Sequence, residues 1–228
     1  MTGPIRVVFF DVDFTLIRPG PAFQGQGYRD FCARHGVVVD PASFERAVIV
    51  ASEALEVRGG EYDPQIFVDY TQRIIEAMGG RGPHVPAAAR DIYAEWASCH
   101  HFSLYDEVPE VLRDLHDEGY TIGLISNTQR SLAEFERHFG LDGLFAVAIS
   151  SSDHGYMKPH PSIFEEGLRR VGVSAAEAAM VGDSVPHDIE GARRAGMRGI
   201  LVSRSGLSRN APPEVPVIRT LRELRPLL

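Results

Sequence analysis

Cysteine, long apolar runs and lysine are all scarce in this sequence. The first two scarcities each exclude a class of protein. The only cysteines, Cys32 and Cys99, form neither a disulfide framework nor a metal-ligand spacing. No apolar run approaches the roughly 20 residues that a membrane helix needs, and the N-terminus lacks the basic-then-apolar pattern of a secretory signal. We therefore expect a soluble, cytoplasmic protein that does not enter a membrane.

Positive charge is also in short supply. The formal net charge is -8, which gives no electrostatic footprint for a nucleic-acid polymer but leaves room for a local basic pocket that binds a small anion. Of the 23 basic Lys and Arg residues, Lys158 is the only lysine. Lysine is a compact point charge and arginine a planar fork, so Lys158 marks a position where the geometry of an ammonium group matters. The sequence carries no signal for an oligomeric state.

Five short apolar runs predict buried strands, and helical patterns that end at glycine separate the last four of them. The predicted strands are 5–10, 121–125, 146–149, 179–181 and 199–202, and the predicted helices that precede the last four are 108–118, 131–139, 161–171 and 188–195. This alternation predicts an α/β core with a doubly wound, Rossmann-like parallel sheet. A proline-rich stretch and a short helix over 219–224 are expected to follow the last strand.

The stretch between the first and second strands has a different character. It is rich in Ala, Glu, Arg and aromatic residues at helical spacing, with predicted helices over 25–34, 43–57, 65–78 and 87–99. We therefore predict two domains, an α/β core formed by residues 1–20 and 103–228 and an inserted all-α cap formed by residues 21–102. A helical cap in this position is expected to close over the substrate and exclude bulk water.

Polar side chains follow four of the predicted strands at the points where these strands end. Asp11, Asp13 and Thr15 follow the first strand, Ser126 and Asn127 the second, Lys158 the third, and Asp183 and Asp188 the fourth. Because ligands of open α/β sheets bind beyond the carboxyl ends of the strands, these residues are expected to form one pocket.

Such a pocket favours metal-assisted chemistry on a phosphate ester. Several carboxylates brought together repel one another unless a cation joins them, and oxygen ligands suit Mg²⁺. A metal held by Asp11, Asp13 and Asp183 could also bind a phosphate oxygen, while Lys158, Ser126 and backbone amides bind the others. A carboxylate in line with the phosphorus can act as the nucleophile and form an aspartyl-phosphate.

The chain resembles the haloacid dehalogenase superfamily at four motifs, which occur in the family's order, spacing and strand context: Asp11-Val12-Asp13-Phe14-Thr15, Ser126-Asn127, Lys158-Pro159, and Gly182-Asp183 with Asp188. The resemblance extends over the whole chain and includes the inserted helical cap. It implies that Asp11 is the nucleophile and a ligand of Mg²⁺, and that Asp13 is the acid and base and lends its backbone carbonyl to the metal.

The resemblance also assigns the remaining site residues. It implies that Thr15 tightens the first loop beside the phosphate, that Ser126 and Asn127 contact the phosphoryl group, and that Lys158 neutralises charge on the nucleophile and the phosphate. Asp183 is expected to bind Mg²⁺ directly. For Asp188, three roles stay open: a metal ligand, either direct or through water, an orienting partner of Lys158, and a plain helix cap. Phe14 departs from the small or polar residue common in the family and puts detailed substrate analogy in doubt.

The resulting prediction is a magnesium-dependent phosphatase acting on a small phosphomonoester. A phosphomutase of the β-phosphoglucomutase type would share every motif and is the main alternative. A 2-haloacid dehalogenase needs neither a metal nor the second acidic residue of the first motif, so Asp13 argues against it. A binding module would require a lost nucleophile or lost metal ligands, and none is lost. Sugar phosphates, phosphoglycolate and nucleotides all stay open as substrates.

Overall fold

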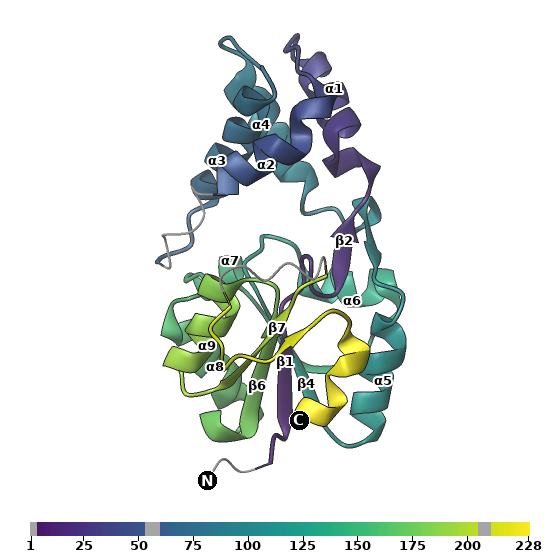
Figure 1. Ribbon diagram of the computed structural model, residues 1–228, viewed down its shortest axis with the longest axis vertical. Coiled ribbons are helices and arrows are strands. Elements are labelled where there is room, and N and C mark those ends of the chain that lie inside the picture. The colour runs from purple at the N-terminus through teal and green to yellow at the C-terminus, as the bar shows by residue number, and fades with distance from the viewer. Residues whose placement is uncertain (1–3, 53–59, 205–210) are drawn as a thin grey trace. The chain divides into compact units, whose positions relative to one another are not determined.

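The computed structural model describes residues 4–52, 60–204 and 211–228, and it divides them into two compact units (Figure 1). The first unit comprises the described residues of 1–18, 59–62 and 104–228, and the second those of 19–58 and 63–103. Within the described residues, no helix is long and apolar enough to cross a membrane.

The first unit is built on a parallel sheet, as predicted, and the sheet has six strands where five were predicted. Its strands lie in the order β5-β4-β1-β6-β7-β8, and their bounds are β1 Val7–Phe10, β4 Thr121–Ser126, β5 Phe145–Ser150, β6 Ala178–Gly182, β7 Arg198–Val202 and β8 Val217–Ile218. All four residues of β1 and all five of β6 are buried. Continuous apolar runs of this kind are typical of parallel strands that are covered on both faces.

Helices cover both faces of the sheet (Figure 1). They are α5 Val108–Asp117, α6 Leu132–Phe139, the short α7 Ser151–His154, α8 Pro161–Val171 and α9 Glu190–Arg194. On the face covered by α8 and α9, Phe164 packs in one apolar cluster with Phe9 and Ile125 of the sheet. Gly140 and Gly172 end α6 and α8 in the left-handed conformation, which glycine adopts without a steric penalty.

The second unit is helical, as predicted for the insertion. Its helices are α1 Gly25–Arg34, α2 Phe44–Ser52, α3 Pro64–Ala77 and α4 Val85–Glu95. Helix α3 begins with Pro64 at its first position and with the Asp63 side chain accepting a hydrogen bond from the Gln65 backbone nitrogen at 2.9 Å. Proline and aspartate suit a helix start because the first turn has no internal partners for its N–H groups. The end of the predicted helix 43–57 lies outside the described residues.

Three local features differ from the sequence prediction. The predicted helix 188–195 begins instead as a π-helical turn, Val185–Ile189, which continues into α9. Strand β8 and a two-stranded sheet of β2 (Ile17–Pro19) and β3 (Phe102–Leu104) were not predicted, because two or three residues carry too little periodicity. Residues 60–62, inside the predicted cap stretch, pair with the first unit: the Tyr62 backbone nitrogen donates to the Gly155 carbonyl at 2.8 Å.

Candidate active site

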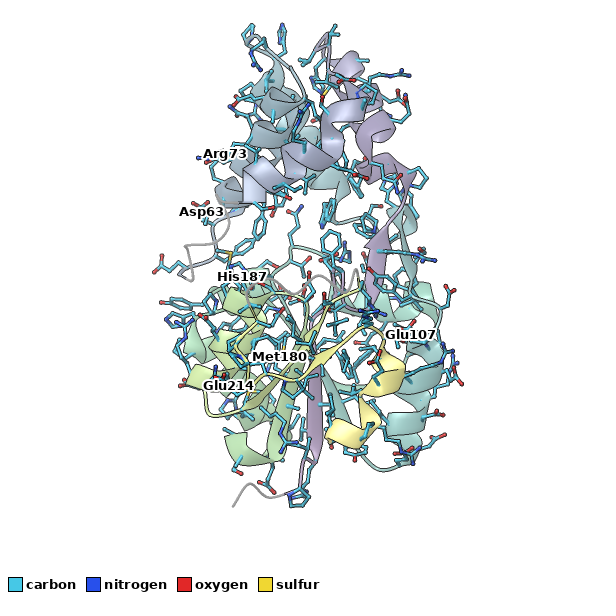
Figure 2. The ribbon with its side chains drawn as sticks, in the orientation of Figure 1. Asp63, Arg73, Glu107, Met180, His187 and Glu214 are labelled. Atoms are coloured by element: carbon cyan, nitrogen blue, oxygen red, sulfur yellow. The ribbon has the colours of Figure 1, made fainter. Side chains whose placement is uncertain are left out.

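The parallel register of β1, β4 and β6 brings the motif residues of the first unit to one edge of the sheet. Phe10 pairs with Leu124 on β4 and with Val181 on β6, so Asp11 lies level with the carboxyl ends of both neighbours. Figure 2 shows His187 near this edge and Met180, on β6, within the core of the same unit. The site is therefore assembled by backbone pairing of the sheet, before any side chain contributes.

Lys158 is the centre of the site. Its ammonium nitrogen donates to Asp11 Oδ1 at 2.7 Å, to Asp188 Oδ1 at 2.6 Å and to the Ile125 carbonyl oxygen at 2.8 Å. Only 2% of its surface is exposed. Burial by itself would lower the pKa of Lys158, but the charges of Asp11 and Asp188 outweigh this effect and raise it above the usual lysine value. Lys158 is therefore a fixed positive charge between two carboxylates.

Asp188 is positioned from both of its carboxylate oxygens. Oδ1 accepts the Lys158 hydrogen bond, and Oδ2 accepts one from the Ser184 backbone nitrogen at 3.0 Å. Glycine at residue 182 leaves room for the Asp188 carboxylate, because a Cβ on residue 182 would lie 2.3 Å from that carboxylate. Asp188 is 1% exposed, and these two hydrogen bonds hold its carboxylate beside Lys158.

A group of three carboxylates has the chemistry of a cation site. Oxygen atoms of Asp11, Asp183 and Asp188 all lie within 4.8 Å of one another. Asp183 keeps solvent-exposed surface, yet the protein atoms around its carboxylate, followed by the charges of Asp11 and Asp188, raise its pKa well above the usual value. Burial also raises the pKa of Asp11, against the lowering effect of Lys158. Carboxylates that repel in this way fit a divalent cation with oxygen ligands.

Asp13 is paired with an arginine that sequence reasoning missed. Arg130 Nη1 lies 3.0 Å from Asp13 Oδ1 and 3.3 Å from Oδ2. Burial raises the pKa of Asp13, and the Arg130 charge opposes that shift without cancelling it. Arg130 follows the Ser126-Asn127 motif in a loop, where a lone arginine looks like a solvated surface residue, and no sequence signal indicated its burial.

The loop after β1 is held in an unusual conformation. Phe14 has a φ of 62°, in the left-handed region that favours glycine, and its side chain is 43% exposed. Next to it, Thr15 is fully buried and its carbonyl oxygen accepts a hydrogen bond from Arg204 Nη2 at 2.6 Å. Arg204 also pairs with Glu107 and lies over the Tyr105 ring, 3.8 Å from its centroid. This second arginine, also missed from sequence, ties the loop of the first motif to the segment after β7.

Ser126 and Asn127 use their side chains differently. The Asn127 amide donates to the Lys158 carbonyl at 2.9 Å and accepts from the Lys158 backbone nitrogen at 2.7 Å, so it fixes the backbone that carries the lysine. The buried hydroxyls of Ser126 and Thr15 have no hydrogen-bond partner among the described residues. Because an unpaired buried hydroxyl costs roughly 1 to 3 kcal/mol, both positions suit a further polar group such as a phosphate oxygen.

Outside this site, the helical unit holds a smaller cluster. Glu95 Oε2 lies 2.9 Å from His101 Nε2, and the His100 and His101 ring centroids lie 4.0 Å apart. Ser98 Oγ lies 2.7 Å from His100 Nδ1. The residues Cys99–His101 form a 3₁₀ turn, which brings the two rings together. The side chains of His100 and His101 thus each have a hydrogen-bond partner within the helical unit.

The parallel sheet, the loop after β1 and the group of three carboxylates together define an α/β protein with an aspartate-rich site at the carboxyl edge of its sheet. The haloacid dehalogenase-like hydrolase family matches residues 5–196 of the chain. A glyceraldehyde 3-phosphate phosphatase of Methanothermobacter thermautotrophicus is 30% identical, over 98% of this chain and 100% of the relative. The chain therefore belongs to the haloacid dehalogenase-like hydrolases.

Two solved structures show that this family includes different chemistries. A 2-haloacid dehalogenase from Pseudomonas syringae is 27% identical with a TM-score of 0.64, and a HAD phosphatase from Thermococcus onnurineus is 25% identical with a TM-score of 0.66. Each comparison covers 98% of this chain and 97% of the other. Family membership confirms the predicted fold and the hydrolase class, and the choice between these chemistries depends on the site residues.

Proposed function

We propose that this hydrolase is a magnesium-dependent phosphatase that acts on a small phosphomonoester through an aspartyl-phosphate on Asp11. The observation that carries the proposal is the second carboxylate, Asp13, which follows the nucleophile by two residues and is held by Arg130. Dehalogenation has no need of this acid, whereas an alkoxide leaving group does. The similarity to a glyceraldehyde 3-phosphate phosphatase supports the same choice.

In the first step, an Asp11 carboxylate oxygen attacks phosphorus and the bond to the leaving oxygen breaks. Lys158, 2.7 Å from Asp11 Oδ1, offsets the negative charge that the nucleophile and the phosphoryl group share. Asp13 donates its proton to the leaving oxygen, and the pKa raised by burial favours the protonated form that this step requires. In the second step, Asp13 takes a proton from the water that attacks phosphorus, and Asp11 is released.

The metal-binding residues in this proposal are Asp11, Asp183 and the backbone carbonyl of Asp13. When bound, Mg²⁺ polarises the phosphoryl group and neutralises charge on its oxygens. Asp188 was predicted as a metal ligand, as an orienting partner of Lys158 or as a plain helix cap. Because both of its oxygens accept hydrogen bonds, from Lys158 and from Ser184, we assign it to positioning Lys158 beside the metal ligands.

Phosphate release from a panel of phosphomonoesters tests the proposal. The panel contains p-nitrophenyl phosphate, glyceraldehyde 3-phosphate, other sugar phosphates, phosphoglycolate and nucleoside monophosphates, each with Mg²⁺ and then with excess chelator. Wild type should release phosphate only with the metal, Asp11→Asn should release none, and Asp117→Asn, a change at an exposed residue of α5, should behave as wild type. Isomerisation of a sugar phosphate without net release would instead identify a phosphomutase.

A further inference from the structure

Arg130 is a buried charge beside the candidate active site. It lies between β4 and α6, only 1% of its surface is exposed, and it is the largest fully buried side chain in the described part of the chain. Removing a guanidinium from water costs several kcal/mol unless a carboxylate and further hydrogen bonds compensate it. A buried arginine at this position therefore points to a specific partner.

That partner is the acid and base of the proposed reaction. One Arg130 nitrogen, Nη1, contacts both Asp13 oxygens, at 3.0 and 3.3 Å, across 117 residues of sequence. Arg130 therefore ties both oxygens of the Asp13 carboxylate to one guanidinium nitrogen.

The backbone that carries Arg130 is itself anchored. Its nitrogen donates to Thr128 Oγ1 at 3.0 Å, and the Thr128 backbone nitrogen donates to Ser151 Oγ at 3.1 Å. Ser152 in turn donates its backbone N–H to the Thr128 carbonyl at 3.3 Å. Arg130 is thus fixed to the junction of β5 and α7, and it can transmit this rigidity to Asp13.

We propose that Arg130 is a positioning residue for Asp13, an inference that rests on the proposed phosphatase function. Arg130 holds the Asp13 carboxyl group at the angle from which it protonates the leaving oxygen while the Asp11–phosphorus bond forms. The guanidinium has no proton to give near neutral pH, so Arg130 cannot itself be the acid, and its effect on protonation of the leaving group passes through Asp13. Its loss should therefore affect most strongly the substrates whose leaving group needs a proton.

The test compares kcat/KM for the best alkyl phosphate of the panel with kcat/KM for p-nitrophenyl phosphate, whose leaving group departs without protonation. We expect the alkyl-to-aryl ratio to fall about tenfold or more in Arg130→Met, since a positioned acid contributes about 10²- to 10⁴-fold. Arg130→Lys, which keeps a positive charge but not the fork, should recover part of the ratio. Arg198→Met is the matched control, because Arg198 bonds the Leu227 carbonyl at the opposite end of β7 and should leave the ratio unchanged.

A double variant shows whether the effect passes through Asp13. In an Asp13→Asn background, Arg130→Met should leave the alkyl-to-aryl ratio unchanged. Equal losses for both substrates, a further fall of the ratio in the double variant, or failure of both Arg130→Met and Arg130→Lys to fold would each overturn the positioning role. A wild-type protein that releases no phosphate from either ester refutes the proposed function instead, and this inference with it.

Discussion

Replacing Lys158 by methionine is the perturbation for which the structure gives the clearest energetic expectation. The change keeps the approximate length of the side chain but removes a charge that bonds two buried carboxylates, Asp11 and Asp188, at 2.7 and 2.6 Å. The Asp11 and Asp188 side chains are only 11% and 1% exposed, so solvent compensates the lost cation poorly. Removing one partner of a buried pair typically costs about 3 to 5 kcal/mol, which for a chain of this size lowers the melting temperature by about 6 to 20 °C.

The assay is thermal unfolding followed by circular dichroism, with chelator and then with Mg²⁺. In chelator, Lys158→Met should melt well below wild type, whereas Arg6→Met, which removes an exposed pair with Glu177, should change little. Mg²⁺ should raise the melting temperature of Lys158→Met more than that of wild type, because the metal then supplies the only cation for the carboxylate group. The deficit should also shrink as the pH falls, because protonation neutralises the unpaired carboxylates.

A loss below about 1 kcal/mol in chelator, the range of a surface pair, would refute the reasoning. It would mean that Asp11 and Asp188 are protonated or hydrated in the folded protein, and that Lys158 does not hold them as a charged pair. The same conclusion would follow if Mg²⁺ raised the melting temperatures of variant and wild type equally.

Three further predictions follow from the site and its supports. Asp11→Asn should abolish phosphate release while its melting temperature stays within a few degrees of wild type, and near-normal turnover would exclude Asp11 as nucleophile. Gly182→Ala, whose new Cβ would lie 2.3 Å from the Asp188 carboxylate, should cost about 1 to 3 kcal/mol and lower kcat, whereas Gly60→Ala, with no atom nearby, should do neither. Burial by itself would raise the pKa of Glu107, but the hydrogen bond and charge of Arg204 overcome this effect and lower the pKa to about 2. The ionised pair therefore contributes its full share to the free energy of unfolding above the unfolded-state pKa near 4.5, and this contribution is lost as the pH falls towards 2. In Glu107→Gln, the free energy of unfolding should therefore fall less steeply as the pH is lowered from about 4.5 to 2. The same slope in the variant and in wild type would contradict the lowered pKa of Glu107.

The core sheet could be predicted because its strands are nearly continuous apolar runs separated by helices that end at glycine. The proximity of Asp11 and Asp183 could be predicted for the same reason, since each stands close after such a run and the parallel register of β1 and β6 brings their ends together. Periodicity could not predict β8, which has two residues, or the π-helical turn that presents Asp188. In both cases, tertiary pairing decides the local structure.

The two arginines could not be recognised because their role depends on burial and on distant partners. Arg130 reaches Asp13 across 117 residues and Arg204 reaches the Thr15 carbonyl across 189. In a chain whose basic residues are almost all arginine, neither residue differs in sequence from the many that lie on the surface. Asn127 likewise has a partner, the Lys158 peptide, that only the folded chain identifies.

The single lysine of the chain now has a physical explanation. Its three acceptors, Asp11 Oδ1, Asp188 Oδ1 and the Ile125 carbonyl, converge on one nitrogen at 2.6 to 2.8 Å. An ammonium group directs three N–H bonds outward from one point and can satisfy all three acceptors. A guanidinium spreads its donors over a planar fork and cannot direct three N–H bonds from one point, and Arg130 contacts both Asp13 oxygens through Nη1. The three converging acceptors therefore suit a lysine beside Asp11, whereas the single Asp13 carboxylate is contacted by one guanidinium nitrogen of Arg130.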